Sequence, residues 1–373
     1  MNKFLFSNGK IFTGQRWWRD ASVLVDDRTI KKVSTHISDK DAKEIRLEGG
    51  LLIPAFIDLQ LYGGNGQLFG EHPSVESLKA TYAYCVSGGA LHCMPTVATN
   101  SIEVMHAAIE AVRSYQQQQL PGVLGLHLEG PFINAAKKGA HIQEFIHAPT
   151  LDEVVQLMEK GKDVIKMITL APEICGPGII SFLLEQGVLV SAGHTNANYS
   201  EAMKAFDMGI PLATHLYNAM SPLQHRAPGM TGAIFNHPNA KASLVADGHH
   251  VDFAAITIAK KIMGERLFLI TDAVTENKEG LYQHRLDADK YVVADGTLSG
   301  SALTMLKAVK NCVSQAVIPL DEAVRMASLY PARAIKADNR LGKIEAKYDA
   351  ELLWLDEDLN IKGIYSNGSF VSS

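Results

Sequence analysis

Eight apolar segments, each ending in polar residues and followed by a helix-like stretch, fill the middle of this 373-residue chain. The segments have the length and composition of buried strands, and the stretches between them have the apolar spacing of amphipathic helices. Alternation of strand and helix favours a parallel sheet, and eight repeats favour a closed barrel. We therefore predict an α/β fold with a (β/α)8 TIM-like barrel. The strands are expected at 57–61, 91–96, 124–129, 166–172, 189–194, 212–215, 242–247 and 267–272, and the helices at 75–87, 102–118, 151–160, 178–185, 200–206, 252–263, 302–315 and 321–330.

The two ends of the chain have a different rhythm. Short strand patterns separated by Gly, Asp and Lys turns fill residues 1–53, and the same style resumes from about residue 341, including an Asn-Gly turn. We expect residues 1–53 and 335–373 to pair into one small β domain, and residues 54–334 to form the catalytic barrel.

Composition excludes several classes of protein. Hydrophobic residues make up 47% and charged residues 20%, which are values of an ordinary globular protein. The net charge is −5 and no run rich in Lys and Arg is present, so we expect no nucleic-acid partner. No apolar run reaches the ~18 residues of a membrane span, and no signal peptide is expected. The four cysteines lack C-x-x-C spacing, which predicts reduced thiols and a cytoplasmic location.

The stretch from Val123 to His141 combines a strand with reactive side chains. Glu129 ends an apolar run, and Gly130-Pro131 then forces a turn, so a carboxylate is expected at the carboxyl end of a strand. Barrel enzymes place their chemistry at this end of the strands. His141 follows within the same loop and is close enough in sequence to reach back over the carboxylate.

Three further strand ends carry residues suited to metal-assisted hydrolysis, namely His194, His215 and Asp272. Two imidazoles and a carboxylate give zinc three ligands and leave a fourth position for water. One such histidine alone is as often a hydrogen-bonded core residue, and Asp272 alone is a reasonable helix N-cap. Four of these residues at four strand ends favour a site, in which Asp272 serves as the proton acceptor and donor that amide hydrolysis requires.

Seven motifs occur in a fixed order along nearly the whole chain. They are DLQLYGG (58–64), LHLEGPF to KKGAH (126–141), SAGHT (191–195), THLYNAM to HRAPG (214–229), ADGHHV (246–251), LITDA (269–273) and GTLSGSALTM (296–305). Together they resemble the N-acetylglucosamine-6-phosphate deacetylase family of the amidohydrolase superfamily. The resemblance implies a barrel with a small β-sandwich made by both chain ends, and a cytoplasmic enzyme of amino-sugar catabolism that forms homodimers.

The same resemblance assigns roles to individual residues. It implies metal binding by Glu129, His194 and His215, proton transfer by Asp272, and stabilisation of the acetyl oxygen by His141. The implied substrate is N-acetyl-D-glucosamine 6-phosphate, with its phosphate held by an arginine. The further residues implied in substrate binding are Ala140, Asn218, Ala219, Arg226, Asp247 and His250, and a substrate-covering loop of Leu298, Ser299 and Gly300.

Two positions depart from the usual pattern. Many amidohydrolases have His-x-His at the end of the first strand, where this chain has Gln60 and Tyr62, so we expect one divalent metal per chain with Gln60 as a supporting residue. Zinc is the first expectation, and iron, cobalt or manganese also suit the ligands. Ala227 replaces an acid that commonly follows the arginine, which bears on how Arg226 is oriented.

Alternative functions differ in specific features. The galactosamine epimer, or another N-acetyl sugar phosphate, would use the same chemistry with different loop contacts. A cyclic amidohydrolase would usually need the His-x-His pair and often a lysine after the fourth strand, where this chain has Ala171-Pro172-Glu173. A catalytically silent sugar-phosphate-binding protein has no need to keep Asp272 together with every metal ligand. The sequence leaves open the metal, the epimer, the oligomeric state and whether Arg226 acts within its own subunit.

Overall fold

The computed structural model describes residues 3–372 and divides the chain into two compact units. One unit contains residues 58–87 and 92–304, and the other contains the chain up to residue 57, residues 88–91 and the chain from residue 305 on. Residues 305–334 thus group with the chain ends, whereas we expected them in the barrel domain. The limits at 53/54 and 334/335 stay a prediction, and residues 1, 2 and 373 lie outside the described residues.

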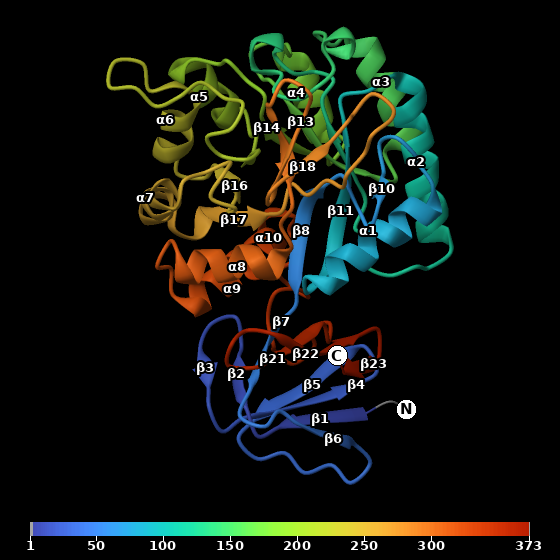
Figure 1. Ribbon diagram of the computed structural model, residues 1–373, viewed down its shortest axis with the longest axis vertical. Helices are drawn as coiled ribbons and strands as arrows, with labels where there is room; N and C mark the ends of the chain where they lie inside the picture. The colour runs from blue at the N-terminus through green and yellow to red at the C-terminus, as the bar shows by residue number, and fades with distance from the viewer. Residues whose placement is uncertain (1–2, 373) are drawn as a thin grey trace. The chain divides into compact units, whose positions relative to one another are not determined.

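Eight parallel strands form the barrel, and their order in the sheet follows their order in the chain (Figure 1). The barrel closes where the backbone N–H of Asp272 donates to the carbonyl of Gln60 (2.9 Å) and that of Tyr62 donates to Ala273 (2.8 Å). The predicted barrel is confirmed. Its strands are β8 (Phe56–Leu61), β11 (Ala90–Ala98), β12 (Leu126–Glu129), β13 (Ile165–Leu170), β14 (Leu189–Ala192), β15 (Leu212–Ala213), β16 (Lys241–Val245) and β17 (Leu267–Ile270).

Helices follow the barrel strands and flank them on both sides (Figure 1). All but one lie where the apolar spacing predicted them. The exception is α6, whose sequence GMTGAIFN is buried along most of its length and therefore has no polar face to reveal a helical period. The helices of this unit are α1 (Val75–Ser87), α2 (Ile102–Gln117), α3 (Leu151–Gly161), α4 (Pro177–Glu185), α5 (Tyr199–Asp207), α6 (Gly229–Asn236) and α7 (Phe253–Met263), with short 3-10 turns at Ala135–Lys137, Gln143–Phe145 and Gly264–Arg266.

Small sheets lie in the loops of the same unit. A three-stranded antiparallel sheet contains β18 (Arg285–Asp287), β19 (Lys290–Val292) and β20 (Leu298–Ser301), and a two-stranded one contains β9 (Gly63–Gly64) and β10 (Gln67–Leu68). The segment predicted as a substrate-covering loop, Leu298–Gly300, is therefore a strand paired with β19. The segment consists mostly of small and polar residues, so its sequence lacks the apolar pattern by which a strand is predicted.

The other unit joins the two ends of the chain. Its six-stranded sheet pairs β7 from the first part of the chain with β21 from the last part, as expected for one domain made by both ends. Side chains from this sheet and from a four-stranded sheet form one buried core, so the two sheets make a sandwich. The strands are β5 (Thr29–Ser34), β4 (Ser22–Asp26), β1 (Lys3–Ser7) and β6 (Lys43–Arg46) in one sheet, and β23 (Ser369–Ser372), β22 (Ile361–Ser366), β21 (Leu352–Leu355), β7 (Leu51–Pro54), β2 (Lys10–Phe12) and β3 (Trp17–Trp18) in the other.

Three helices also group with this unit, namely α8 (Met305–Ser314), α9 (Leu320–Ala327) and α10 (Leu329–Ala334). The single helix predicted for residues 321–330 is two helices, because the backbone at Ser328 leaves the helical region. All four cysteines are buried, and none forms a disulfide within the described chain. Among residues 3–372, no helix is both long and apolar enough to cross a membrane.

Glu351 makes the stability of the molecule sensitive to pH. Burial raises the pKa of its carboxyl from 4.5 to about 7, and its Oε2 is enclosed without a hydrogen-bond partner among the described residues. The folded chain therefore holds a proton that the unfolded chain releases between these two pH values, so stability falls as the pH rises from 4.5 to 7. The variant Glu351→Gln has no proton to release at this position, so this fall in stability with pH is absent from it.

We expect the stability of Glu351→Gln relative to the native chain to increase by up to about 3 kcal/mol between pH 4 and pH 8. Urea unfolding of both proteins across this range measures the change. Glu357 is exposed, so Glu357→Gln is a matched control that should leave the pH dependence unaltered. If the stabilities of Glu351→Gln and of the native chain change in parallel with pH, the raised pKa of Glu351 is contradicted.

Candidate active site

Four predicted site residues meet at the carboxyl ends of the barrel strands. Glu129 is the last residue of β12, and His194, His215 and Asp272 follow β14, β15 and β17. The latter three have positive φ angles of 47°, 36° and 56°. This left-handed conformation is uncommon outside glycine, although His and Asp tolerate it better than most residues. It turns the chain sharply where each strand ends.

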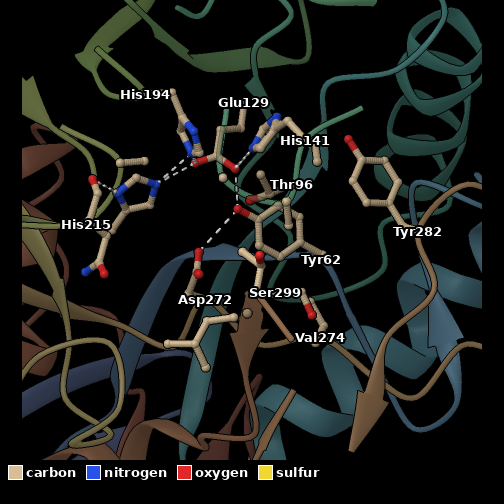
Figure 2. Close-up of a pocket in the computed structure, with 18 of the residues that line it drawn as sticks. Tyr62, Thr96, Glu129, His141, His194, His215, Asp272, Val274, Tyr282 and Ser299 are labelled. Atoms are coloured by element: carbon tan, nitrogen blue, oxygen red, sulfur yellow. Dashed lines mark hydrogen bonds and ion pairs between the residues drawn. The ribbon is translucent and has the colours of Figure 1, made fainter. Parts of the chain in front are cut away.

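Three imidazoles surround the Glu129 carboxylate, which is fully buried (Figure 2). The Nε2 atoms of His194 and His215 lie 3.4 Å and 3.1 Å from Glu129 Oε1, and 3.0 Å from each other. His141 Nε2 lies 3.2 Å from the other carboxylate oxygen, Oε2. The cluster therefore offers two sets of three ligand atoms, one that includes His215 and one that includes His141.

The partners of the Nδ1 atoms separate these two sets. His194 Nδ1 lies 2.8 Å from the carbonyl oxygen of Lys137, and His215 Nδ1 lies 3.2 Å from that of Asn218. A carbonyl only accepts, so both rings donate from Nδ1, and the neutral form of each ring has its lone pair on Nε2. His141 Nδ1 instead accepts from the backbone N–H of Thr99 (3.3 Å) and lies 2.7 Å from the Thr99 hydroxyl, which can donate to it as well. Its Nε2 faces the Glu129 carboxylate, which only accepts, so we assign the proton to Nε2. His194 and His215 are thus prepared as metal ligands, and His141 is prepared as a hydrogen-bond donor.

The donor set fits one divalent metal ion. Ligand atoms of a tetrahedral zinc with bonds of about 2.0–2.1 Å lie about 3.4 Å apart, close to the spacing of Glu129 Oε1 and the Nε2 atoms of His194 and His215. The ligand atoms of Glu129, His141 and His194 all lie within 4.8 Å of one another. A carboxylate and imidazoles accept several divalent metals, so the ligands do not identify the ion.

The charges of the cluster are consistent with metal binding. Burial opposes ionisation of Glu129, but the surrounding imidazoles of His141, His194 and His215 outweigh it and hold the pKa of this carboxyl well below its usual range. Burial lowers the pKa of His194 to about 4, which leaves the imidazole neutral at pH 7. At His215 burial acts in the same direction, but the contact with Glu129 outweighs it and raises the pKa, so metal binding there would release a proton. A carboxylate and a neutral imidazole are the forms that bind a metal.

Asp272 lies beside the cluster and shares its partners. Gln60 Nε2 is 3.0 Å from Glu129 Oε1 and 2.8 Å from Asp272 Oδ1, so one amide contacts both carboxylates. Burial raises the pKa of Asp272, and the charge of Glu129 raises it further, against an opposing effect of His215. A carboxyl with a raised pKa accepts and returns a proton more readily than an ordinary aspartate.

Tyr62 is a site residue that the sequence did not lead us to propose. Its hydroxyl contacts Glu129 Oε2, Gln60 Nε2 (2.9 Å) and Asp272 Oδ1 (3.2 Å), and it lies between the two carboxylates in Figure 2. Burial raises the pKa of this phenol well above 10, so it keeps its proton. The sequence did contain one indication of this role: Tyr62 occupies the position at which the His-x-His pattern has its second histidine.

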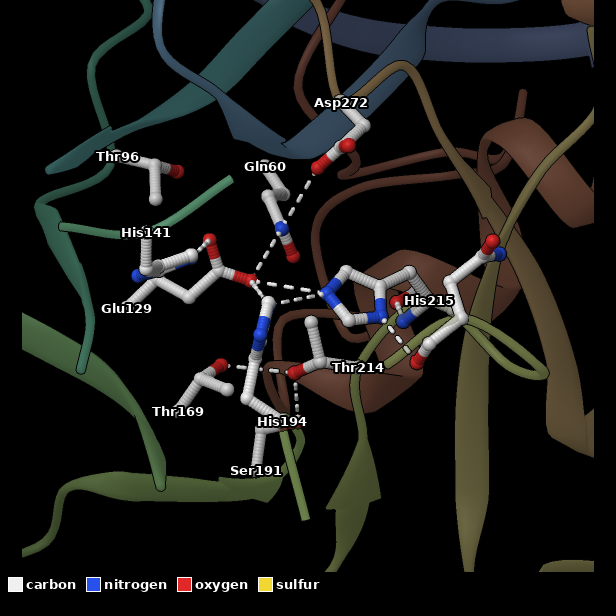
Figure 3. A network of polar contacts seen from close by, with 12 residues as sticks. Gln60, Thr96, Glu129, His141, Thr169, Ser191, His194, Thr214, His215 and Asp272 are labelled. Atoms are coloured by element: carbon white, nitrogen blue, oxygen red, sulfur yellow. Dashed lines mark hydrogen bonds and ion pairs between the residues drawn. The ribbon is translucent and has the colours of Figure 1, made fainter. Parts of the chain in front are cut away.

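A chain of hydroxyl groups lies next to the cluster (Figure 3). Thr214 Oγ1 is 2.7 Å from Thr169 Oγ1 and 2.6 Å from Ser191 Oγ, and Thr169 also contacts His127 Nε2 at 2.8 Å. All four side chains are buried inside the barrel and satisfy one another. This polar layer fixes the backbone that carries His215.

The cluster opens into a cavity of about 380 Å³, and most of the predicted substrate residues line it. Those in the lining are Ala140, His141, Asn218, Ala219, His250, Leu298, Ser299 and Gly300. Asp247 lies behind the wall, where its carboxylate accepts a hydrogen bond from His250 Nδ1 at 2.6 Å. Arg226 is exposed and does not line the cavity, so its predicted contact with phosphate stays a prediction. Tyr282 and His284 line the cavity as well, and no motif pointed to them.

Known proteins resemble this chain along its whole length. The Amidohydrolase family model matches residues 51–371. The N-acetylglucosamine-6-phosphate deacetylase of Haemophilus influenzae is 34% identical, with 99% of both chains covered. The N-acetylgalactosamine-6-phosphate deacetylase of a Shewanella species is 33% identical and covers 97% of this chain and 94% of its own. The crystal structure of N-acetylglucosamine-6-phosphate deacetylase from Pasteurella multocida superposes with a TM-score of 0.95 at 35% identity, over 100% of both chains. The family indicated by the motifs is confirmed, and the chain belongs to the amidohydrolase family.

Proposed function

We propose that this amidohydrolase hydrolyses N-acetyl-D-glucosamine 6-phosphate to D-glucosamine 6-phosphate and acetate. One observation carries the proposal: a buried Glu-His-His cluster, a carboxyl with a raised pKa and an imidazole N–H donor all face one cavity. This is the set of groups that hydrolysis of an unactivated amide requires. The similarity to sugar-phosphate deacetylases supports the substrate class.

In this proposal Glu129, His194 and His215 hold one divalent metal, with zinc as the first expectation. A bound ion would act as a Lewis acid on the acetyl carbonyl and would acidify a water molecule. Gln60 and Tyr62 hold the carboxylates of Glu129 and Asp272 in place through neutral hydrogen bonds. They offer no imidazole for a second ion.

The protein groups move one proton and stabilise one negative charge. Asp272 takes a proton from the attacking water as the new C–O bond forms, and the carbonyl oxygen becomes negative. His141 donates its Nε2–H to that oxygen, because its Nδ1 accepts from Thr99. Asp272 then gives its proton to the sugar nitrogen as the C–N bond breaks, and the free amine and acetic acid leave, the acid losing its proton to solvent to become acetate.

Binding of the rest of the substrate rests on the cavity wall. Asn218 and Ala219 offer polar groups beside the cluster, and Asp247 orients His250 toward the cavity. The exposed position of Arg226 supports a role at a neighbouring subunit, where its guanidinium would bind the phosphate within a homodimer. We place the reaction in the cytoplasm, where thiols are kept reduced.

The test is acetate release by purified protein of known metal content. We expect turnover of N-acetylglucosamine 6-phosphate that depends on about one metal per chain, with the galactosamine epimer and the unphosphorylated sugar measured alongside. Preference for the epimer would keep the mechanism and change the substrate, which is the alternative that the Shewanella relative supports. No release from any of them by metal-loaded protein would refute the proposal.

A further inference from the structure

His284 and Ser299 form a polar pair in a largely apolar part of the cavity wall. His284 is 5% exposed and lies just before β18, and Ser299 is 7% exposed and lies on β20. Both line the cavity, and His284 Nδ1 is 2.9 Å from Ser299 Oγ. The apolar side chains of Leu68, Val274 and Tyr282 form a small buried cluster, and all three line the same cavity.

One nitrogen of His284 remains available to a ligand. Nδ1 is bonded to Ser299, whereas Nε2 makes no hydrogen bond to the described residues and belongs to a ring that faces the cavity. The Tyr282 ring lies nearly parallel to the imidazole, with an interplanar angle of 18° and centroids 6.2 Å apart. The ring is thus held from two sides. Nε2 is therefore a polar group in the cavity wall that a bound ligand can use as a hydrogen-bond partner.

The chemistry of the pair indicates the kind of ligand group. Burial lowers the pKa of His284 to about 4, so the imidazole is neutral at pH 7 and offers no charge to a phosphate. The Ser299 hydroxyl either donates to Nδ1 or accepts from it, which leaves Nε2 as a donor in one case and an acceptor in the other. A hydroxyl group satisfies Nε2 in both cases, because it donates and accepts equally well.

We propose that His284, held by Ser299, binds a hydroxyl of the sugar ring and thereby determines which sugar epimer the enzyme prefers. The proposal rests on the proposed function for the class of substrate. Two relatives of similar identity act on epimeric sugars, which shows that epimer preference varies among proteins this closely related. A site that bonds a particular hydroxyl discriminates against a sugar that presents it elsewhere, because the buried partner is then left unsatisfied.

The experiment compares both epimers in three variants. His284→Leu removes the polar group, His284→Gln keeps a polar group at similar reach, and Ser299→Ala releases the imidazole. We expect His284→Leu to lower kcat/KM at least about tenfold for the preferred epimer and by much less for the other, so that their ratio falls. His284→Gln should restore part of the ratio. The exposed His36 lies in the other unit, and His36→Gln is the matched control.

A second readout needs no turnover. Calorimetric titration of the metal-loaded protein with glucosamine 6-phosphate and galactosamine 6-phosphate measures the contact directly, because both sugars keep the ring hydroxyls. We expect His284→Leu to weaken binding of one product at least about tenfold with unchanged metal content. Equal losses for both epimers, or no loss in either measurement, would show that the pair only braces the sheet and would overturn the proposal.

The two hypotheses fail in different ways. A native protein that releases no acetate but binds one amino sugar phosphate through His284 refutes the proposed function and keeps the inference. A native protein that deacetylates normally, with a ratio of epimers unaffected by His284→Leu, refutes the inference alone. A native protein that neither releases acetate nor binds either sugar phosphate refutes both.

Discussion

Asp272→Asn is expected to lower kcat by at least about 10³-fold while the metal content and the affinity for substrate stay close to those of the native protein. The amide keeps the size of the side chain and its contact with Gln60, but it neither accepts the proton of water nor donates one to the leaving amine. The variant is therefore slowed in the chemical step, whereas its binding of substrate is preserved. Steady-state kinetics with metal analysis on the same sample measures both effects.

The matched control is Asp41→Asn, because Asp41 is exposed and lies in the other unit. It should have native kcat and KM. Turnover of Asp272→Asn within about tenfold of the native rate would exclude Asp272 from the proton transfers. Loss of metal from this variant would show instead that Asp272 belongs to the ligand set, and the ligands would then have to be reassigned.

The sequence predicted the reacting groups well because a parallel barrel imposes strong order. In a parallel barrel the carboxyl ends of all strands lie at one face. Residues that end apolar runs must therefore meet there, and four do so: Glu129, His194, His215 and Asp272. The structure places them there, with the imidazoles directed at one carboxylate. Periodicity also predicted the strands, because each is buried and bounded by turn residues.

The features that escaped prediction depend on contacts between distant residues. Tyr62 and Asp272 meet because the first and last strands of the barrel pair, and nothing near Tyr62 in sequence indicates this contact. The pairing of His284 with Ser299 depends on the register of β18 to β20, and these strands carry little apolar pattern, because β18 is short and exposed and β20 has the small and polar sequence LSGS. Arg226 has the chemistry to bind phosphate, but its exposed position could not be read from the motif.

His215→Ala is expected to lose most of its metal and nearly all turnover, whereas His141→Ala should keep about one metal per chain and lose about 10²–10³-fold in kcat. The two histidines are both buried, and each has Nε2 within 3.2 Å of a Glu129 oxygen, so distance alone does not separate them. Their tautomers do. His215 donates from Nδ1 to Asn218 and leaves Nε2 free, and His141 accepts at Nδ1 from Thr99.

Metal analysis of the two variants after dialysis measures this difference directly, with His194→Ala as the reference for loss of a ligand. The exposed His36→Gln shows the metal content of an unaffected protein. If His141→Ala loses metal as completely as His194→Ala, then Glu129, His141 and His194 form the ligand set, and the Thr99 contact does not determine the tautomer. If His141→Ala keeps its metal, its residual rate reports how much the Nε2–H donor contributes to stabilising the oxyanion, because the metal and Asp272 are both still in place.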